Sequence, residues 1–395
     1  MPDLVYLDHA ATTPLTPAAR SAVSEELGRV GNPSSLHGRG RAARSVVEES
    51  REALATALGA HPSEVVFTSG GTEADNLAVE GSFRARRAAD PRRVRLIVSA
   101  IEHHAVLETA EHLEAHDGAE VTWVSPDADG VISPYAVRSA IASDPASVGV
   151  VSVMWANNET GVVQPVRAIV DVAAEFGIPV HSDAVQAFGH VPVDFGVSGL
   201  DFMTVTAHKL GGPIGVGALV ARRGAELAPL SHGGGQERDV RSGTLNAAGA
   251  RGFAVAATDA VATLTEESAR LTALRDRLIR GAMAVDPTIT VTGAWEGADG
   301  IHRLPGNAHL LVPDCDGEAL LYLLDAAGIA CSTGAACRAG VTRQSHVLTA
   351  MGVPDGAAGA LRLTLGHTST DTDVDAFLAA LPGAVAGARR AFAVT

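Results

Sequence analysis

Apolar runs of strand length alternate with amphipathic stretches of helical period over the first 220 residues. Seven of these runs predict β-strands: Glu64–Thr68, Val94–Ser99, Glu120–Val124, Val148–Met154, Ile178–His181, Phe202–Thr206 and Val216–Val220. Five intervening segments predict helices: Ala42–Leu58, Thr72–Arg87, Ala105–Ala115, Tyr135–Ala142 and Val166–Phe176. Strands that alternate with helices are typical of a mainly parallel sheet covered on both faces. We therefore expect an α/β fold with a mainly parallel seven-stranded sheet sandwiched by helices.

The pattern changes after about residue 255. A long helix is predicted over Ala256–Ala282, a second helix over Gly317–Ala327, and strands over Thr288–Thr292, Ala308–Val312 and Ala360–Leu365. Short strands mixed with helices indicate a smaller α+β domain at the C-terminal end. We expect a large domain over residues 15–255 and a small domain over residues 256–395, with the N-terminal segment 1–14 belonging to the small domain.

Charge and cysteine content narrow the class of protein. The chain has 30 Lys and Arg against 45 Asp and Glu, a net charge of −15, which disfavours nucleic acid and anionic membranes as partners. We find neither an apolar run long enough to span a membrane nor the pattern of a secretory signal at the N-terminus. Three cysteines are no disulfide framework in a chain of 395 residues. These features predict a cytoplasmic protein.

Lys209 is the only lysine in the sequence, since the other 29 basic residues are arginines. Arginine can replace lysine where only charge matters, but a guanidinium does not form imines. A single lysine is therefore either a chance survivor or a residue whose primary amine is needed. Its sequence context decides between these alternatives.

Three successive strand ends carry groups that suit one cofactor. The turn Ser69–Glu73 has two glycines at the start of a predicted helix, where backbone N–H groups can bind an anion, although an ordinary turn would look the same. Asp183 comes at the end of the short apolar strand predicted over Ile178–His181, either as a helix cap or as a carboxylate facing a protonated ring nitrogen. Lys209 lies just beyond Phe202–Thr206. An amine, a carboxylate and an anion cradle at one sheet edge predict a pyridoxal phosphate site.

The sequence resembles the cysteine desulfurases of the class V aminotransferase group over nearly the whole chain. The motifs that carry the resemblance run in order along the sequence: Tyr6–Pro14 (YLDHAATTP), Gly31–Ser34 (GNPS), Glu102–Leu107 (EHHAVL), Asn157–Glu159 (NNE), His232–Gly235 (HGGG), Arg241–Thr244 (RSGT) and Leu361–Leu363 (LRL). One departure is Thr206-Ala207 before His208-Lys209, where the family often has Ser-Gly; the hydroxyl survives.

The resemblance implies a role for each matching residue. Lys209 forms the imine with the cofactor, Asp183 keeps the pyridine nitrogen protonated, and His103 stacks on the ring. Asn158 and Gln186 hydrogen-bond the phenolic oxygen of the ring. The phosphate is held by four residues and by one residue of a neighbouring subunit, which requires a homodimer: Gly71, Thr72, Thr206, His208 and, across the interface, Thr244. Arg362 binds the substrate carboxylate with help from Asn32.

Cys337 distinguishes this chain from a plain transaminase. It lies in a run of small residues, Ser332–Gly340, beside Arg338, where a thiol has a lowered pKa and can act as a nucleophile. In the desulfurases the matching cysteine takes the sulfur of the substrate and becomes a persulfide. Cys315 and Cys331 lie in or beside apolar patterns, and we interpret both as structural.

The resemblance therefore implies an enzyme that converts L-cysteine to L-alanine and donates sulfur from a persulfide. The acceptor is expected to be a protein of iron–sulfur cluster assembly, of tRNA thiolation or of DNA sulfur modification. Two alternatives stay open: a selenocysteine lyase or another class V transferase, and a catalytically idle docking platform. The combination of Lys209, Asp183, His103 and Cys337 argues against the idle platform, which needs none of them. No metal ligand set is expected.

Overall fold

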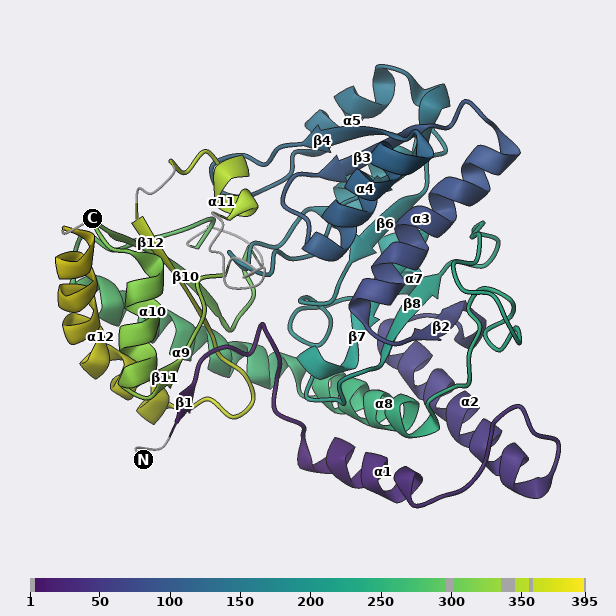
Figure 1. The fold of residues 1–395 in the computed structure, drawn as a ribbon, viewed down its shortest axis with the longest axis horizontal. Coiled ribbons are helices and arrows are strands. Elements are labelled where there is room, and N and C mark those ends of the chain that lie inside the picture. The colour runs from purple at the N-terminus through teal and green to yellow at the C-terminus, as the bar shows by residue number, and fades with distance from the viewer. Residues whose placement is uncertain (1–3, 296–301, 335–344, 355–357, 394–395) are drawn as a thin grey trace.

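The computed structural model describes residues 4–295, 302–334, 345–354 and 358–393. Two layered units lie side by side, a larger one with a wide sheet and a smaller one formed mostly by the C-terminal third of the chain (Figure 1). Within the described ranges, no helix combines the length and the apolar character needed to cross a bilayer.

The larger unit contains a seven-stranded sheet in the order β2-β8-β7-β6-β5-β3-β4. Its strands are β2 (Val65–Thr68), β3 (Arg95–Ser99), β4 (Glu120–Val124), β5 (Val148–Ser152), β6 (Val180–Asp183), β7 (Phe202–Thr206) and β8 (Gly217–Ala221). β8 is antiparallel to both of its neighbours, and the pairs from β7 to β4 are parallel. The predicted mainly parallel seven-stranded sheet is confirmed.

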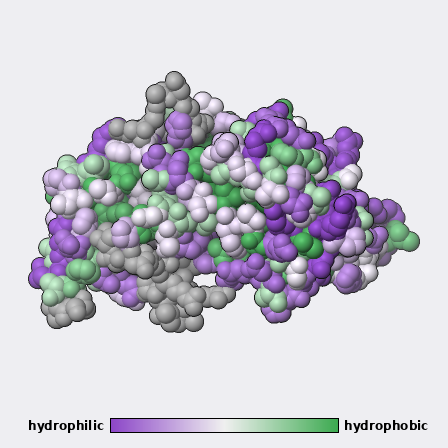
Figure 2. All heavy atoms as spheres, turned by 90° about the horizontal axis from the view of Figure 1, so that it is seen from above, coloured by the Kyte–Doolittle hydropathy of each residue, from purple (hydrophilic) through white to green (hydrophobic). Residues whose placement is uncertain are grey.

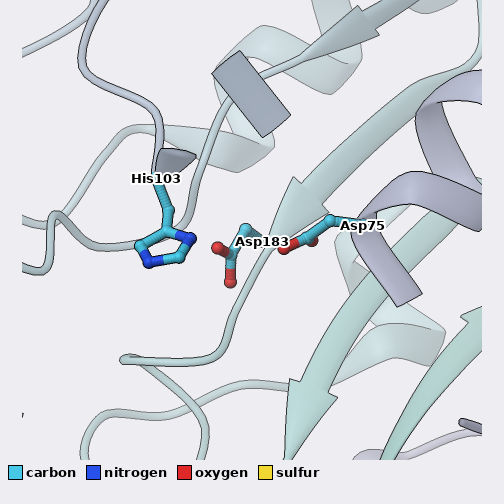
Figure 3. Close-up of side chains that lie close together, drawn as sticks. All are labelled: Asp75, His103 and Asp183. Atoms are coloured by element: carbon cyan, nitrogen blue, oxygen red, sulfur yellow. The ribbon is translucent and has the colours of Figure 1, made fainter. Parts of the chain in front are cut away.

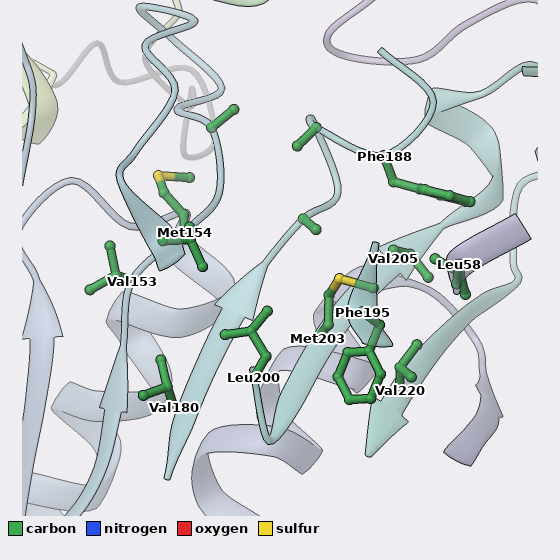
Figure 4. Close-up of a cluster of buried hydrophobic side chains, with 14 of the residues drawn as sticks. Leu58, Val153, Met154, Val180, Phe188, Phe195, Leu200, Met203, Val205 and Val220 are labelled. Atoms are coloured by element: carbon green, nitrogen blue, oxygen red, sulfur yellow. The ribbon is translucent and has the colours of Figure 1, made fainter. Parts of the chain in front are cut away.

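Helices cover both faces of this sheet because alternate strand residues point to opposite sides. Leu219 of β8 packs in an apolar cluster with Leu77 on one face, whereas Val220 belongs to the large cluster on the other. Figure 4 shows part of that large cluster, between the sheet and Leu58, Phe188 and Phe195. The helices are α1 (Pro17–Leu27), α2 (Gly38–Leu58), α3 (Gly71–Ala89), α4 (His104–Asp117), α5 (Pro134–Ala142), α6 (Val166–Ala174), α7 (Phe195–Ser198) and α8 (Ala247–Ala262).

The smaller unit is built on a three-stranded antiparallel sheet in the order β12-β10-β9 and a parallel pair of β1 and β11. Its elements are β1 (Val5–Tyr6), α9 (Leu264–Val285), β9 (Thr290–Val291), β10 (Asn307–Pro313), α10 (Gly317–Ala326), β11 (Ile329–Ala330), α11 (His346–Ala350), β12 (Ala358–Thr364) and α12 (Asp371–Phe392). A separate apolar cluster, which includes Leu7, Leu310 and Phe377, forms its core.

Three expectations about elements need correction. The single helix predicted over Ala256–Ala282 is two helices, because α8 ends at Ala262 and α9 starts at Leu264. The strand predicted over Thr288–Thr292 is reduced to the two residues of β9. Helices α1 and α12 were not predicted. Ala256 and Ala257, at the start of the expected small domain, belong to α8 and pack in the core of the larger unit.

Candidate active site

The carboxyl ends of the parallel strands open onto a cavity of about 400 Å³ between the two units. Ten of the residues singled out from the sequence line it: Gly71, Thr72, His103, Asn158, Asp183, Gln186, Thr206, His208, Lys209 and Arg362. They come from the ends of β2, β6 and β7, from the loops after β3 and β5, and from β12 of the smaller unit. The fold therefore brings together groups that are up to 291 positions apart in the sequence, from Gly71 to Arg362.

Lys209 lies in the short turn that follows β7, with its side chain mostly enclosed. Its Nζ donates hydrogen bonds to the backbone carbonyls of Ala10 and Ala11 in the N-terminal segment. Burial lowers the pKa of Lys209 to about 8, and the positive charge of Arg362 contributes in the same direction. A substantial fraction of this amine is therefore neutral near pH 7.5, as a nucleophile or a base requires.

Asp183, at the end of β6, is 5% exposed, and its Oδ1 accepts the backbone N–H of Val185 at 2.8 Å. Burial raises its pKa to about 8, and repulsion from Asp75 adds to the shift. Asp75 projects from the first turns of α3 into the same space and is 1% exposed. Figure 3 shows both carboxyl groups beside the ring of His103; one ligand atom from each residue lies within 4.8 Å of the others.

His103 caps the N-terminus of α4, where its Nδ1 accepts the backbone N–H of Ala105 at 3.1 Å. Burial lowers the pKa of His103 to about 4, and the nearby Lys209 ammonium adds to this effect. The imidazole is therefore neutral at pH 7, with its ring facing the cavity. His208, next to Lys209, also has its pKa lowered to about 4 by burial. Its Nδ1 lies 3.2 Å from the hydroxyl of Thr12.

The turn between β2 and α3 forms an open cradle at the start of a helix. A Cβ on Gly71 would lie 3.0 Å from Cγ2 of Val185, so a larger residue here would press on a side chain that also lines the cavity. α3 begins at Gly71, and Thr72 lines the cavity beside it. The backbone N–H groups at a helix start attract anions. The hydroxyl of Thr206 donates to the carbonyl of Val216 at 3.2 Å.

Arg362 reaches the cavity from β12 and is 6% exposed. Its Nη1 donates to the carbonyl of Asn158 at 2.9 Å and its Nη2 to Oδ1 of Asp8 at 2.8 Å. Two polar atoms at this end of the cavity are enclosed without a partner among the described residues: Nε of Arg362 and Oδ1 of Asn158. The amide of Gln186 donates to the carbonyl of Ala10 at 3.0 Å.

Two predicted site residues that the structure describes do not line this cavity, and a third, Cys337, lies outside the described residues. Asn32 is exposed in the loop after α1, where its Oδ1 accepts the backbone N–H of Ser34. Thr244 lines a separate small pocket with Ser69 and Arg241, behind the cradle. Its own subunit therefore does not bring Thr244 to Lys209.

The other two cysteines are poor candidates for a nucleophile. Cys315 is buried, and burial raises the pKa of its thiol. Cys331 is half-buried at the end of β11, and burial raises its pKa to about 12. Neither thiol ionises appreciably at neutral pH.

The sequence interpretation assigned no role to several groups that line the cavity: Asp8, Asp75, His104, Glu159, Ser332 and His346. Asp75 could have been found, because it lies one helical turn after Gly71 and so shares its face of α3. Asp8 follows a two-residue strand, a pattern too short to predict where its side chain lies.

Comparisons with known proteins agree with this geometry. The family model for aminotransferase class V matches residues 5–377. An IscS-like cysteine desulfurase from Mycobacterium tuberculosis is 56% identical over 98% of each chain. A solved NifS-like protein superposes with a TM-score of 0.88 at 35% identity, covering 97% of this chain and 99% of the other. A structure of SspA in complex with cysteine has a TM-score of 0.77 at 32% identity, covering 91% and 98%.

These matches extend over nearly the whole length of both partners, so they cover the cavity as well as the sheet. The chain belongs to the aminotransferase class V family and, within it, to the pyridoxal phosphate-dependent cysteine desulfurases.

Proposed function

We propose that this cavity binds pyridoxal phosphate at Lys209 and Asp183 and L-cysteine at Arg362, and that the sulfur of the substrate passes to Cys337. One observation carries the proposal: the single lysine, a buried carboxylate and a buried guanidinium line one cavity of about 400 Å³. That volume suits a substituted pyridine ring together with a small amino acid.

The groups around the cavity fit the cofactor. The Gly71 cradle leaves room for a phosphate at the start of α3, with the hydroxyl of Thr72 beside it. The enclosed Oδ1 of Asn158 has no partner among the described residues and can accept a hydrogen bond from a bound ligand. The neutral ring of His103 offers a flat surface for stacking. Asp183 provides the carboxylate that a protonated ring nitrogen requires.

The residues of this chain have distinct tasks. When bound, pyridoxal phosphate supplies an aldehyde for amines and a ring that withdraws electrons from the bonds at the substrate Cα. Asp183 holds the proton on the ring nitrogen, because a cation beside it favours its charged form. Lys209 takes the proton from Cα, since its lowered pKa makes it a base near neutral pH.

Substrate recognition rests on Arg362. Its guanidinium offers the bidentate pattern that matches a carboxylate, and it lies in the same cavity as Lys209. The related SspA has been solved with cysteine bound, which supports cysteine as the amino acid that this cavity accepts. His103 and Lys209 are the groups placed to move protons at Cα and at the departing sulfur.

The sulfur transfer balances without an external oxidant. The Cβ–S bond of L-cysteine breaks, an S–S bond forms at Cys337, and Cβ gains a proton to give L-alanine. The two thiol hydrogens of the reactants are conserved, one in alanine and one in the terminal S–H of the persulfide. The persulfide then supplies sulfur to an acceptor protein, for which iron–sulfur cluster assembly and thiolation enzymes are our candidates.

Assembly and location are part of the proposal. We propose a homodimer in which Thr244 binds the phosphate in the partner's cavity, because it does not reach the cavity of its own subunit. Three cysteines and a working thiol suit a reducing compartment, so we place the protein in the cytoplasm. We also propose a large domain from residue 15 and a small domain that includes residues 1–14, with the boundary moved from 255 to Thr263. Pairing of β1 with β11 supports the assignment of the N-terminal segment.

Borohydride reduction tests the proposal. Treatment of the holoenzyme should fix a pyridoxyl group to the peptide that contains Lys209, as mass spectrometry would show. Lys209→Arg keeps the charge but cannot form an imine, so it should bind no cofactor covalently and release no alanine from L-cysteine. A wild-type protein that gains no label would overturn the assignment of the cavity.

A further inference from the structure

The N-terminal segment from Leu7 to Thr13 crosses the floor of the active-site cavity and is fixed at both ends. On the side of the smaller unit, Thr364 of β12 donates its N–H to Leu7 at 2.8 Å, and its hydroxyl accepts the N–H of Ala10 at 2.8 Å. On the side of the larger unit, the N–H of Thr13 donates to the carbonyl of His208 at 2.9 Å. The position of Asp8 is therefore set by backbone contacts with both units.

Asp8 pairs with the arginine that we assign to the substrate carboxylate. Its Oδ1 accepts from Nη2 of Arg362 at 2.8 Å, and the two side chains are 21% and 7% exposed. Tyr6 donates its hydroxyl to the carbonyl of Asp8 at 3.0 Å, which fixes the backbone beside the carboxylate. Both Asp8 and Arg362 line the cavity, so a ligand there meets the pair directly.

A guanidinium as enclosed as that of Arg362 needs a countercharge, because water reaches it poorly. Asp8 supplies that charge within the chain. A substrate carboxylate needs the same guanidinium, and two carboxylates at one cation repel each other in a medium of low dielectric constant. A ligand carboxylate therefore competes with Asp8 rather than adding to it.

We propose that Asp8 holds Arg362 in place until the substrate carboxylate replaces it, so that Asp8 sets the affinity of the enzyme for the α-carboxylate of cysteine. The inference rests on the proposed function in assigning Arg362 to that carboxylate. The exchange favours amino acids over simple amines, because an amine without a carboxylate leaves the pair of Asp8 and Arg362 intact and gains nothing from the guanidinium.

The test measures binding of a carboxylate that has no amine and so cannot form an imine with the cofactor. The probe is 3-mercaptopropionate, which is cysteine without its amino group, and the neutral comparison is 3-mercaptopropionamide. Calorimetric titration of the holoenzyme should show that Asp8→Asn binds the acid about five- to tenfold more tightly than the wild type, while the amide binds both equally. The KM for L-cysteine should fall by a similar factor without a rise in kcat. Unchanged or weaker binding of the acid would overturn the proposal.

Control variants separate this inference from the proposed function. Asp371 forms an exposed ion pair with Arg277 at 3.0 Å and does not line the cavity. Asp371→Asn should therefore leave the affinity for 3-mercaptopropionate unchanged. Arg362→Gln should abolish preference for the acid over the amide. If Arg362→Gln still prefers the acid, the assignment of Arg362 to the substrate carboxylate is wrong. If Arg362→Gln loses the preference but Asp8→Asn binds the acid as the wild type does, only the role of Asp8 is wrong. Asp8→Ser, checked for folding by thermal unfolding, repeats the test with a smaller neutral side chain.

Discussion

Asp75, Glu102 and Asp183 are three of the almost completely enclosed carboxyl groups within or beside the cavity. Burial raises the pKa of each to about 8. Repulsion between like charges prevents all three from ionising together. In the proposed site, a cationic ring nitrogen beside Asp183 would favour charge on that residue and leave Asp75 and Glu102 protonated. The negative charge of the site would then lie where the cofactor needs it.

Glu102 allows a direct measurement of the free energy that it costs to ionise a buried carboxyl group. Its Oε1 accepts from Ser99 at 2.9 Å and from the N–H of Met154 at 2.6 Å, so a glutamine can keep both contacts. In the unfolded chain this carboxyl loses its proton near pH 4.5, whereas in the folded chain it keeps it up to about pH 8. Folding therefore holds one extra proton across this window, and wild-type stability falls as pH rises from 4.5 to 8.

Glu102→Gln removes that dependence. In the cofactor-free protein we expect the free energy of unfolding of the variant, relative to wild type, to rise between pH 5 and pH 8 by on the order of 2–4 kcal/mol. Denaturant titrations at several pH values measure it. Glu266→Gln, on the exposed surface of α9, is the matched control and should show no such trend. A constant difference between Glu102→Gln and wild type would contradict the assignment.

Lys209 can be titrated by itself, because it is the only lysine. The cofactor-free protein is labelled with an amine reagent at increasing pH, and mass spectrometry measures the labelling rate of the peptide that contains Lys209. This rate should reach half of its maximum near pH 8. An ordinary lysine would give a midpoint at about pH 10.4. A midpoint at the ordinary value would mean that the amine is neither enclosed nor close to Arg362.

At the scale of elements, the cradle depends on close packing between β8 and the turn before α3. A Cβ on Gly217 would lie 2.7 Å from the carbonyl carbon of Gly70 and 2.9 Å from its Cα. Backbone atoms cannot yield as a flexible side chain does, so a side chain here must displace the turn. The position of the anion cradle is thus fixed by a glycine on a neighbouring strand.

Gly217→Ala should therefore weaken cofactor binding by about ten- to a hundredfold, since one or two phosphate contacts are misplaced. Equilibrium dialysis with pyridoxal phosphate measures the loss, which should exceed any loss of thermal stability. The control is Gly383→Ala in α12, where a Cβ meets no atom within 4 Å. Equal affinities for Gly217→Ala and wild type would show that the turn tolerates displacement.

The elements that sequence patterns could not predict have physical reasons. α12 contains Pro382 and a glycine beside it, which lower helix propensity. Packing of Val374, Phe377 and Leu381 in the smaller core outweighs that cost. The break at Thr263 falls within a run of helical period, so periodicity alone joins α8 and α9. The ends of the strands, by contrast, can be predicted from the sequence. Most of the residues that line the cavity lie at these ends or in the loops that follow them.

For the whole molecule, the homodimer that we propose would decide whether the site is complete. On the face seen in Figure 2, hydrophobic residues form small groups among hydrophilic ones. Large apolar side chains are strongly exposed near α1 and α2 and after the Lys209 turn, among them Leu27 at 72%, Leu36 at 88% and Ile214 at 78%. Exposed apolar groups of this size mark interfaces when they gather. They support the assembly that would bring Thr244 to a partner's phosphate.

A mixing experiment tests this arrangement. Thr244→Ala should lose about tenfold in cofactor affinity, because one hydrogen bond to a charged group is gone. Lys209→Ala should bind no cofactor covalently. Mixed dimers of the two variants contain one site with both native residues if Thr244 acts across the interface, so one site per dimer should bind the cofactor with wild-type affinity. If Thr244 acts within its own subunit, mixing restores nothing.

The central claim is that sulfur leaves cysteine and is carried by Cys337. Intact-mass spectrometry of the holoenzyme after L-cysteine, together with alanine release, should show one added sulfur on wild type, Cys331→Ser and Cys315→Ser. Cys337→Ser should still show the spectral change of cysteine binding but should gain no sulfur and release little alanine, because a serine hydroxyl attacks divalent sulfur poorly. Wild-type sulfur loading in Cys337→Ser, or its loss in Cys331→Ser instead, would contradict the account.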